Sequence, residues 1–173
     1  MRVAVAALLL AAAVGRAEDR VPEPLGLMVM LKVVSYDTAF ASHGTGDFVV
    51  LVPFAPGEET KAAELVKVGA GLEVKSIKER PLRFVAVPLS ELGGKKGAAV
   101  LLHAGLPGFK AALEKAKEEK LYVLAFDEAE VREGALLGVG LANGKPQPLV
   151  NVAAMKAIGA DFGPVLRLAR TFQ

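Results

Sequence analysis

Short apolar runs alternate with helix-like segments along the middle of this chain, and this alternation limits the folds open to it. Most of the runs are apolar throughout, which is typical of strands buried on both faces of a parallel sheet. We therefore predict an α/β fold with a mostly parallel central sheet, helices on both faces and right-handed crossovers. The predicted strands span residues 47–54, 80–89, 98–104 and 121–126, and the predicted helices 27–40, 58–68, 109–120 and 127–134.

A β-hairpin is predicted towards the C-terminus, where two apolar runs meet at Asn143-Gly144, the preferred pair for a type I′ turn. A two-residue loop places Leu137 opposite Val150. In this register Pro146 and Pro148 fall on the outward side of the return strand, where the ladder needs no N–H donor. The hairpin is therefore predicted to form an antiparallel edge of the sheet.

Two helices are predicted after the hairpin. Asn151 is placed to cap the first, over residues 152–158, and Gly159 to end it. Asp161 is placed to cap a final helix whose apolar stripe would contain Val165, Leu168 and Phe172.

The first seventeen residues have the pattern of a secretory signal peptide. Arg2 precedes an apolar run over residues 3–14, and small residues stand at Gly15 and Ala17. The run is too short for a membrane span, which needs about 20 apolar residues. We expect cleavage after Ala17, export to the periplasm, and a single domain over residues 18–173.

Composition excludes several classes of function. The sequence has no cysteine, which excludes disulfides, thiol chemistry and cysteine-based zinc sites. It has 21 Lys and Arg against 19 Asp and Glu, and loss of Arg2 and Arg16 with the signal peptide would equalise them. A nucleic-acid partner, which calls for a basic excess, is not expected.

A search for catalytic motifs finds none, so we expect neither an enzyme nor a cofactor. No serine stands in GxSxG, the loop over residues 93–97 lacks the Walker spacing, and the two histidines do not form a metal-binding HExxH helix. A hydrolase with a site assembled from distant residues stays open as a third reading.

Four residues are candidates for binding a small ligand. His103 and Asp127 stand at predicted strand ends, near the edge where such sheets bind ligands. Helix capping also explains Asp127. Arg167 and Arg170 could hold an anion, although a solvated helix face explains both.

Between residues 27 and 172 the chain resembles the YfiR/HmsC-like family of periplasmic regulatory proteins. The matching segments are LKVVSYDTAF, RPLRFVAVPLS, LLGVGLANGKPQ, LVNVAAMKAIGA and LRLAR. The resemblance implies a non-catalytic regulator that binds and restrains a membrane-bound diguanylate cyclase through its periplasmic sensor domain, and so controls cyclic-di-GMP and biofilm formation. It also implies a homodimer in some members, whereas the absence of cysteine excludes their disulfide switch.

A regulator of this kind would present an exposed apolar surface to its partner. We expect that surface on the first helix, with Leu27, Met28, Met30, Tyr36 and Phe40 as the candidate contact residues. The alternative is a small-ligand-binding module resembling half of a periplasmic solute-binding protein. Its site would lie near residues 53–57, residues 103–108 and Asp127, and a concave polar pocket there would favour it.

Overall fold

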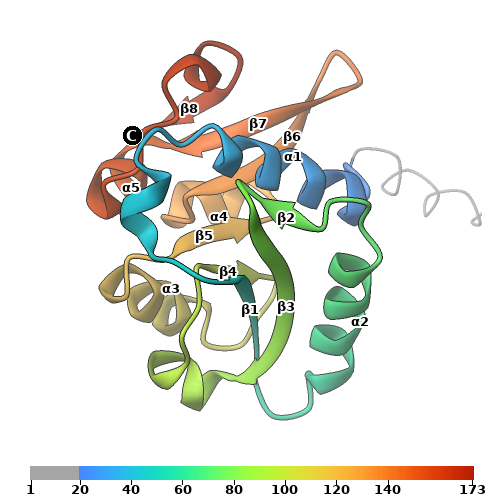
Figure 1. Ribbon diagram of the computed structural model, residues 1–173. Helices are drawn as coiled ribbons and strands as arrows, with labels where there is room; N and C mark the ends of the chain where they lie inside the picture. The colour runs from blue at the N-terminus through green and yellow to red at the C-terminus, as the bar shows by residue number, and fades with distance from the viewer. Residues whose placement is uncertain (1–19) are drawn as a thin grey trace, which may run out of the picture.

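The computed structural model describes residues 20–173, which form one eight-stranded sheet with helices packed on it (Figure 1). The predicted α/β class is confirmed. The strand order is β2-β3-β1-β4-β5-β6-β7-β8. The strands are β1 (Phe48–Phe54), β2 (Ser76–Ile77), β3 (Arg80–Pro88), β4 (Ala99–Leu102), β5 (Tyr122–Ala125), β6 (Leu137–Ala142), β7 (Lys145–Asn151) and β8 (Arg170–Phe172).

Five α-helices and three 3-10 helices connect the strands within this part of the chain. They are α1 (Glu23–Ser35), η1 (Phe40–His43), α2 (Glu59–Ala70), η2 (Leu89–Gly94), α3 (Phe109–Glu118), α4 (Glu128–Glu133), α5 (Val152–Ile158) and η3 (Gly163–Arg167). None of these helices is long and apolar enough to cross a membrane. The predicted signal peptide, residues 1–17, lies outside the described residues.

The centre of the sheet is parallel, as its apolar runs predict. β1 lies between β3 and β4 and pairs with both in parallel, and every residue of β4 and β5 is buried. The chain leaves β1 for β3 on one side and later returns to β4 on the other side. This reversal makes the β1/β4 boundary the topological switch point, where the loops after the two strands diverge and leave a crevice.

The hairpin has the predicted register, with Leu137 opposite Val150 and Ala142 opposite Lys145. The prediction that β7 is the edge of the sheet is wrong at its end, because residues 149–151 pair in parallel with β8. Pro146 and Pro148 lie beyond the reach of β8, so this half of β7 keeps an unpaired side.

The predicted final helix is also wrong. After Phe162 the chain forms only the 3-10 helix η3, and then enters β8. Leu168 is 74% exposed while Phe172 is buried, so the two residues do not share one apolar face. These residues form a strand and not a helix because β8 hydrogen-bonds to the outer backbone groups of β7, which a helix would leave unpaired.

The first helix is displaced towards the N-terminus relative to its predicted span. It begins at Glu23, with Pro24 in its first turn where a missing N–H costs nothing, and ends at Ser35. Its inner face packs Leu27, Met30 and Leu31, all fully buried, into the core.

Candidate ligand-binding site

A polar cavity of about 1170 Å³ opens where β4 and β5 end, beside β6. Its walls include apolar side chains of Phe126, Val139 and Leu141. Its charged or titratable side chains are Arg20, Glu23, Lys61, His103, Asp127 and Glu128. The structure thus brings His103 and Asp127 to one concave, partly polar cavity, as the alternative reading expects, although none of residues 53–57 lines it.

His103 is the buried polar residue of this cavity, with only 2% of its surface exposed. It follows the last residue of β4, so the strand places its ring at the sheet edge. Nδ1 lies 3.3 Å from the carbonyl oxygen of Ala104, and Nε2 lies 3.8 Å from Oε2 of Glu58, beyond hydrogen-bond distance. Neither Nε2 nor Oε2 has a hydrogen-bond partner in the described part of the chain.

The protonation state of His103 follows from this geometry. Burial, the largest cause, lowers the pKa of His103 together with the charge of Lys61, while the carbonyl of Ala104 and the carboxylates of Glu58 and Glu23 act to raise it. We assign the proton of the neutral ring to Nδ1, because the carbonyl oxygen of Ala104 lies within its reach, and this assignment leaves Nε2 as an acceptor. Two acceptors, Nε2 of His103 and Oε2 of Glu58, therefore face each other across the switch point.

Positive charge reaches the same region from two elements. Lys61 on α2 donates from Nζ to the carbonyl oxygen of Ala104, at 2.9 Å, and so holds the loop after β4. Arg20 pairs with Oδ2 of Asp127 at 3.3 Å, although its side chain is 73% exposed. The cavity therefore presents charges of both signs.

Asp127 serves as a helix cap as well as a wall of the cavity. It forms a capping box with Glu130, whose carboxylate accepts from the backbone N–H of Asp127 at 3.0 Å. Burial raises the pKa of Glu130. The two readings of Asp127 weighed from sequence are therefore compatible.

Of the two arginine candidates, the structure places only Arg170 near this site. Its guanidinium group donates to both carboxylate oxygens of Glu128, at 2.8 and 3.1 Å, and Arg132 donates to Glu128 as well. Arg170 therefore holds a wall residue in place. Arg167 lies on η3 and does not line the cavity.

A second concave surface, the α1 groove, lies on the outer face of α1. Its volume is about 810 Å³. It is lined by α1 (Leu25, Met28, Val29, Lys32) with Tyr36 just after it, by β2 with its flanks, by the β6–β7 hairpin and by η3. Met28 and Tyr36, two candidate partner contacts, line it and are 39% and 48% exposed. The prediction for Leu27, Met30 and Phe40 is wrong, because all three are buried in the core.

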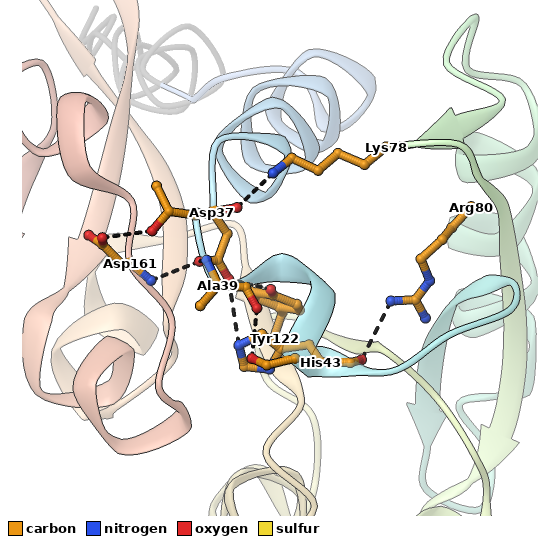
Figure 2. A network of polar contacts seen from close by, with 9 residues as sticks. Asp37, Ala39, His43, Lys78, Arg80, Tyr122 and Asp161 are labelled. Carbon is orange, nitrogen blue, oxygen red and sulfur yellow. Dashed lines mark hydrogen bonds and ion pairs between the residues drawn. The ribbon is translucent and has the colours of Figure 1, made fainter.

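A polar network around Asp37 secures the C-terminal end of α1, and sequence reasoning missed it. Figure 2 shows the buried carboxylate of Asp37 between Tyr122, His43 and the backbone near Asp161. Oδ1 accepts from the backbone N–H groups of Ala39 and Asp161, both at 2.8 Å. Oδ2 accepts from the hydroxyl of Tyr122 and lies 3.5 Å from Nε2 of His43. An isolated aspartate after a helix gives no sequence signal for partners as distant along the chain as Tyr122.

Residues 20–173 assemble neither a metal cluster nor the hydrolase site that stayed open from sequence. They contain no cluster of three or more His, Asp or Glu residues that could hold a metal ion. No hydrogen bond joins a serine to either histidine in this range.

Comparison with known proteins gives similarity of fold alone. No family model matches the chain, and no curated protein sequence matches it. The ABC domain in complex with L-Trp from Streptococcus pneumoniae has a similar structure, with a TM-score of 0.58 and 13% identity over 87% of this chain and 60% of that one. A conserved domain protein from Vibrio cholerae O1 biovar eltor has a TM-score of 0.57 and 13% identity over 88% of this chain and 60% of that one. The chain thus has the fold of these two proteins over about 60% of their length.

Proposed function

We propose that this chain binds a small ligand that carries both an ammonium and an acidic group, such as a free amino acid, in the cavity at the ends of β4 and β5. The observation that carries the proposal is a pair of unpartnered buried acceptor atoms, Nε2 of His103, which lines the cavity, and Oε2 of Glu58, which lies 3.8 Å from it. Buried polar atoms normally have hydrogen-bond partners, and exceptions concentrate at functional sites.

The donor that such a pair calls for is an ammonium group. It has three N–H donors and a positive charge, so it can reach both acceptors and pair with the Glu58 carboxylate. Lys61, close to His103 and Ala104, supplies the charge that would attract an acidic group. Phe126 and Leu141 add apolar wall for a side chain.

The position of the cavity supports the same proposal. Ligands of open α/β sheets bind beyond the carboxyl ends of the strands, at the switch point, and this cavity adjoins the β1/β4 switch. The protein of similar fold from Streptococcus pneumoniae holds L-Trp. Binding without catalysis also agrees with the absence of catalytic motifs in the sequence.

Isothermal titration calorimetry against the common amino acids, with L-Trp among them, tests the proposal. For an amino acid that binds, the analogue without the ammonium group and the analogue without the carboxylate should each bind at least about tenfold more weakly. For L-Trp these are indole-3-propanoate and tryptamine. A tenfold loss corresponds to about 1.4 kcal/mol, the order of one charged hydrogen bond.

A matched pair of variants assigns the binding to this cavity. Glu58→Gln should weaken amino-acid binding about tenfold or more, because the amide keeps the shape and removes the charge. Glu114→Gln is the control, since Glu114 lies exposed on α3, where it pairs with Lys117 and does not line the cavity. Absence of binding by every amino acid, or equal binding by the Glu58 variant and the wild type, would refute the proposal.

A second candidate function is favoured by the α1 groove. The resemblance to YfiR/HmsC-like proteins suggests a periplasmic regulator that restrains a membrane-bound diguanylate cyclase, and such a protein needs an exposed apolar docking surface. The groove, with exposed Met28 and Tyr36, is a surface of that kind. Deletion of the gene should then raise cyclic-di-GMP and matrix production in the host, and unchanged levels of both would remove this candidate.

A further inference from the structure

We infer that the α1 groove binds one amphipathic helix of a partner protein, with an apolar stripe flanked by acidic residues. The inference rests on the protein-docking candidate above and names the chemistry of the partner element. It does not depend on the amino-acid cavity, which lies at the ends of β4 and β5.

The shape of the groove matches a helix of about three turns. Its floor is the outer stripe of α1, from Leu25 through Met28 and Lys32 to Tyr36. This stripe is about 16 Å long at 1.5 Å per residue. Figure 1 shows α1 lying between β2 on one side and the β6–β7 hairpin on the other, and these two elements supply the walls. Such grooves accept an amphipathic helix through anchors at positions i, i+3 or i+4, and i+7.

The positive charge of the groove favours a partner helix that carries negative charge. The charged residues that line it, within the described residues, are Lys32, Lys78 and Lys145, one from each of its three sides. Lys32 lies with Nζ 5.1 Å from the centre of the Tyr36 ring. Lysines set among mostly apolar lining residues favour an apolar segment with carboxylates along its edges, and disfavour a basic one.

The same walls exclude an added β-strand. On β7 the outward positions before β8 begins are Pro146 and Pro148, which have no N–H to offer to a new strand. On the other wall β2 has only two residues, Ser76 and Ile77. Strand addition relies on a row of backbone donors and acceptors, which neither wall provides.

The groove is held in shape before any partner arrives. Leu27, Met30 and Leu31 anchor the inner face of α1 in the core. Just after the C-terminal end of α1, the backbone carbonyl of Asp37 accepts a hydrogen bond from Lys78 at 2.7 Å (Figure 2). This bond ties the β2–β3 turn to the Asp37 network. A preformed surface loses little entropy on binding, so a short helix can bind it measurably.

Fluorescence anisotropy with designed peptides tests this inference. The probe is a labelled helical peptide of about fifteen residues, with leucines at i, i+3, i+4 and i+7 and glutamates on the flanks. One comparison peptide has lysines in place of the glutamates, and another has the same composition with the leucines dispersed. The glutamate peptide should bind the protein at least about tenfold more tightly than either comparison peptide.

Three variants locate the binding site. Met28→Glu places a carboxylate on the apolar floor and should weaken the glutamate peptide about tenfold or more. Val85→Glu is the matched control, since Val85 is 43% exposed on β3 and does not line the groove. The double variant Lys32→Glu with Lys145→Glu should reverse the preference and favour the lysine peptide.

Four outcomes would overturn the inference. The first is no binding of the glutamate peptide at millimolar concentration, and the second is equal binding of the dispersed peptide. The third is that the protein binds dodecanoate or anionic phospholipid vesicles but not the glutamate peptide, and that Met28→Glu abolishes this lipid binding. The groove would then be a lipid site. The fourth is a wild-type dimer that Met28→Glu dissociates, which would assign the groove to a second copy. Glu58→Gln should leave peptide binding unchanged, so failure of the cavity proposal and failure of this one are distinguishable.

Discussion

The buried carboxylate of Asp37 connects four parts of the chain. Through it, the end of α1 meets η1, β5 and the loop before η3. Burial and the neighbouring Asp37 raise the pKa of Tyr122 well above its usual range, so the hydroxyl is a donor at neutral pH. Because contacts from four parts of the chain depend on this one carboxylate, its loss should destabilise all four together.

Asp37→Ala is expected to lower the free energy of unfolding by about 3–5 kcal/mol, because it leaves the buried hydroxyl of Tyr122 and two part-buried N–H groups without their acceptor. Urea denaturation followed by circular dichroism measures the loss. The control is Asp47→Ala, which removes an exposed ion pair with Arg83 and should cost about 1 kcal/mol or less. Similar losses for the two variants would contradict the role assigned to Asp37.

The lowered pKa of His103 predicts that the stability of the protein depends on pH just below neutrality. Burial, aided by the charge of Lys61, lowers this pKa in the folded state, while Glu58 and Glu23 act in the opposite direction. The unfolded chain therefore binds the proton more readily. This contribution is fully present above pH 6.5, the unfolded value, and is lost as pH falls from 6.5 to the lower folded pKa.

The measurement is the melting temperature of the wild type and of His103→Gln from pH 7.5 downwards. The wild type should lose more stability than the variant in the window that begins at pH 6.5 and extends to lower pH. Parallel curves for the two proteins would show that His103 titrates alike in the folded and unfolded states.

At the scale of elements, α2 depends on one close approach to β3. A Cβ atom added at Gly69 would lie 2.5 Å from the ring of Phe84, although the helical backbone at Gly69 would suit alanine. Gly69→Ala gains up to about 1 kcal/mol of helix propensity and forces a ring or a helix to move. We expect a net destabilisation of about 1–3 kcal/mol, measured by thermal unfolding.

The matched control is Gly94→Ala at the end of η2, where an added Cβ meets nothing within 4 Å. Its stability should stay within about 0.5 kcal/mol of the wild type. If Gly69→Ala were stabilising, the contact between α2 and β3 would have to be looser than the structure shows.

Elements with local signals could be predicted from the sequence, and elements made by distant partners could not. Asn143-Gly144 fixes the hairpin register because the turn type depends on two adjacent residues. β2 is a counter-example: it turns into β3 through Lys78 and Glu79, both with positive φ, where no glycine or asparagine marks the turn. The residues of β8 have a helix-like apolar pattern. They form a strand because they pair with β7, about twenty residues earlier in the chain, and a local pattern does not report such a partner.

In the whole molecule, the residues of the candidate cavity also divide into those that local sequence signals predict and those that only the fold brings together. His103 and Asp127 could be placed because the carboxyl ends of parallel strands share one edge of the sheet. Glu58 and Lys61 could not be identified as their neighbours, because more than forty residues separate them from His103 and only the crossover brings α2 to β4. On α1, the helical spacing identified an apolar stripe but not which of its residues face inwards.

The last strand links the edge of the sheet to the cavity, so its removal should affect the whole molecule. β8 covers residues 149–151 of β7, Phe172 joins Val131 and Leu149 in a small apolar cluster, and Arg170 holds Glu128 at the cavity wall. A chain shortened by residues 170–173 should melt at a lower temperature and associate as concentration rises, because the uncovered β7 edge can pair with another copy.

Phe172→Ala separates the two effects, because it removes the aromatic packing and keeps the backbone of β8. It should lower the melting temperature and leave the protein monomeric to the same concentration as the wild type in sedimentation velocity. If the shortened chain did not associate more readily than Phe172→Ala, protection of the sheet edge would not be a role of β8, and its contribution would reduce to the packing of Phe172.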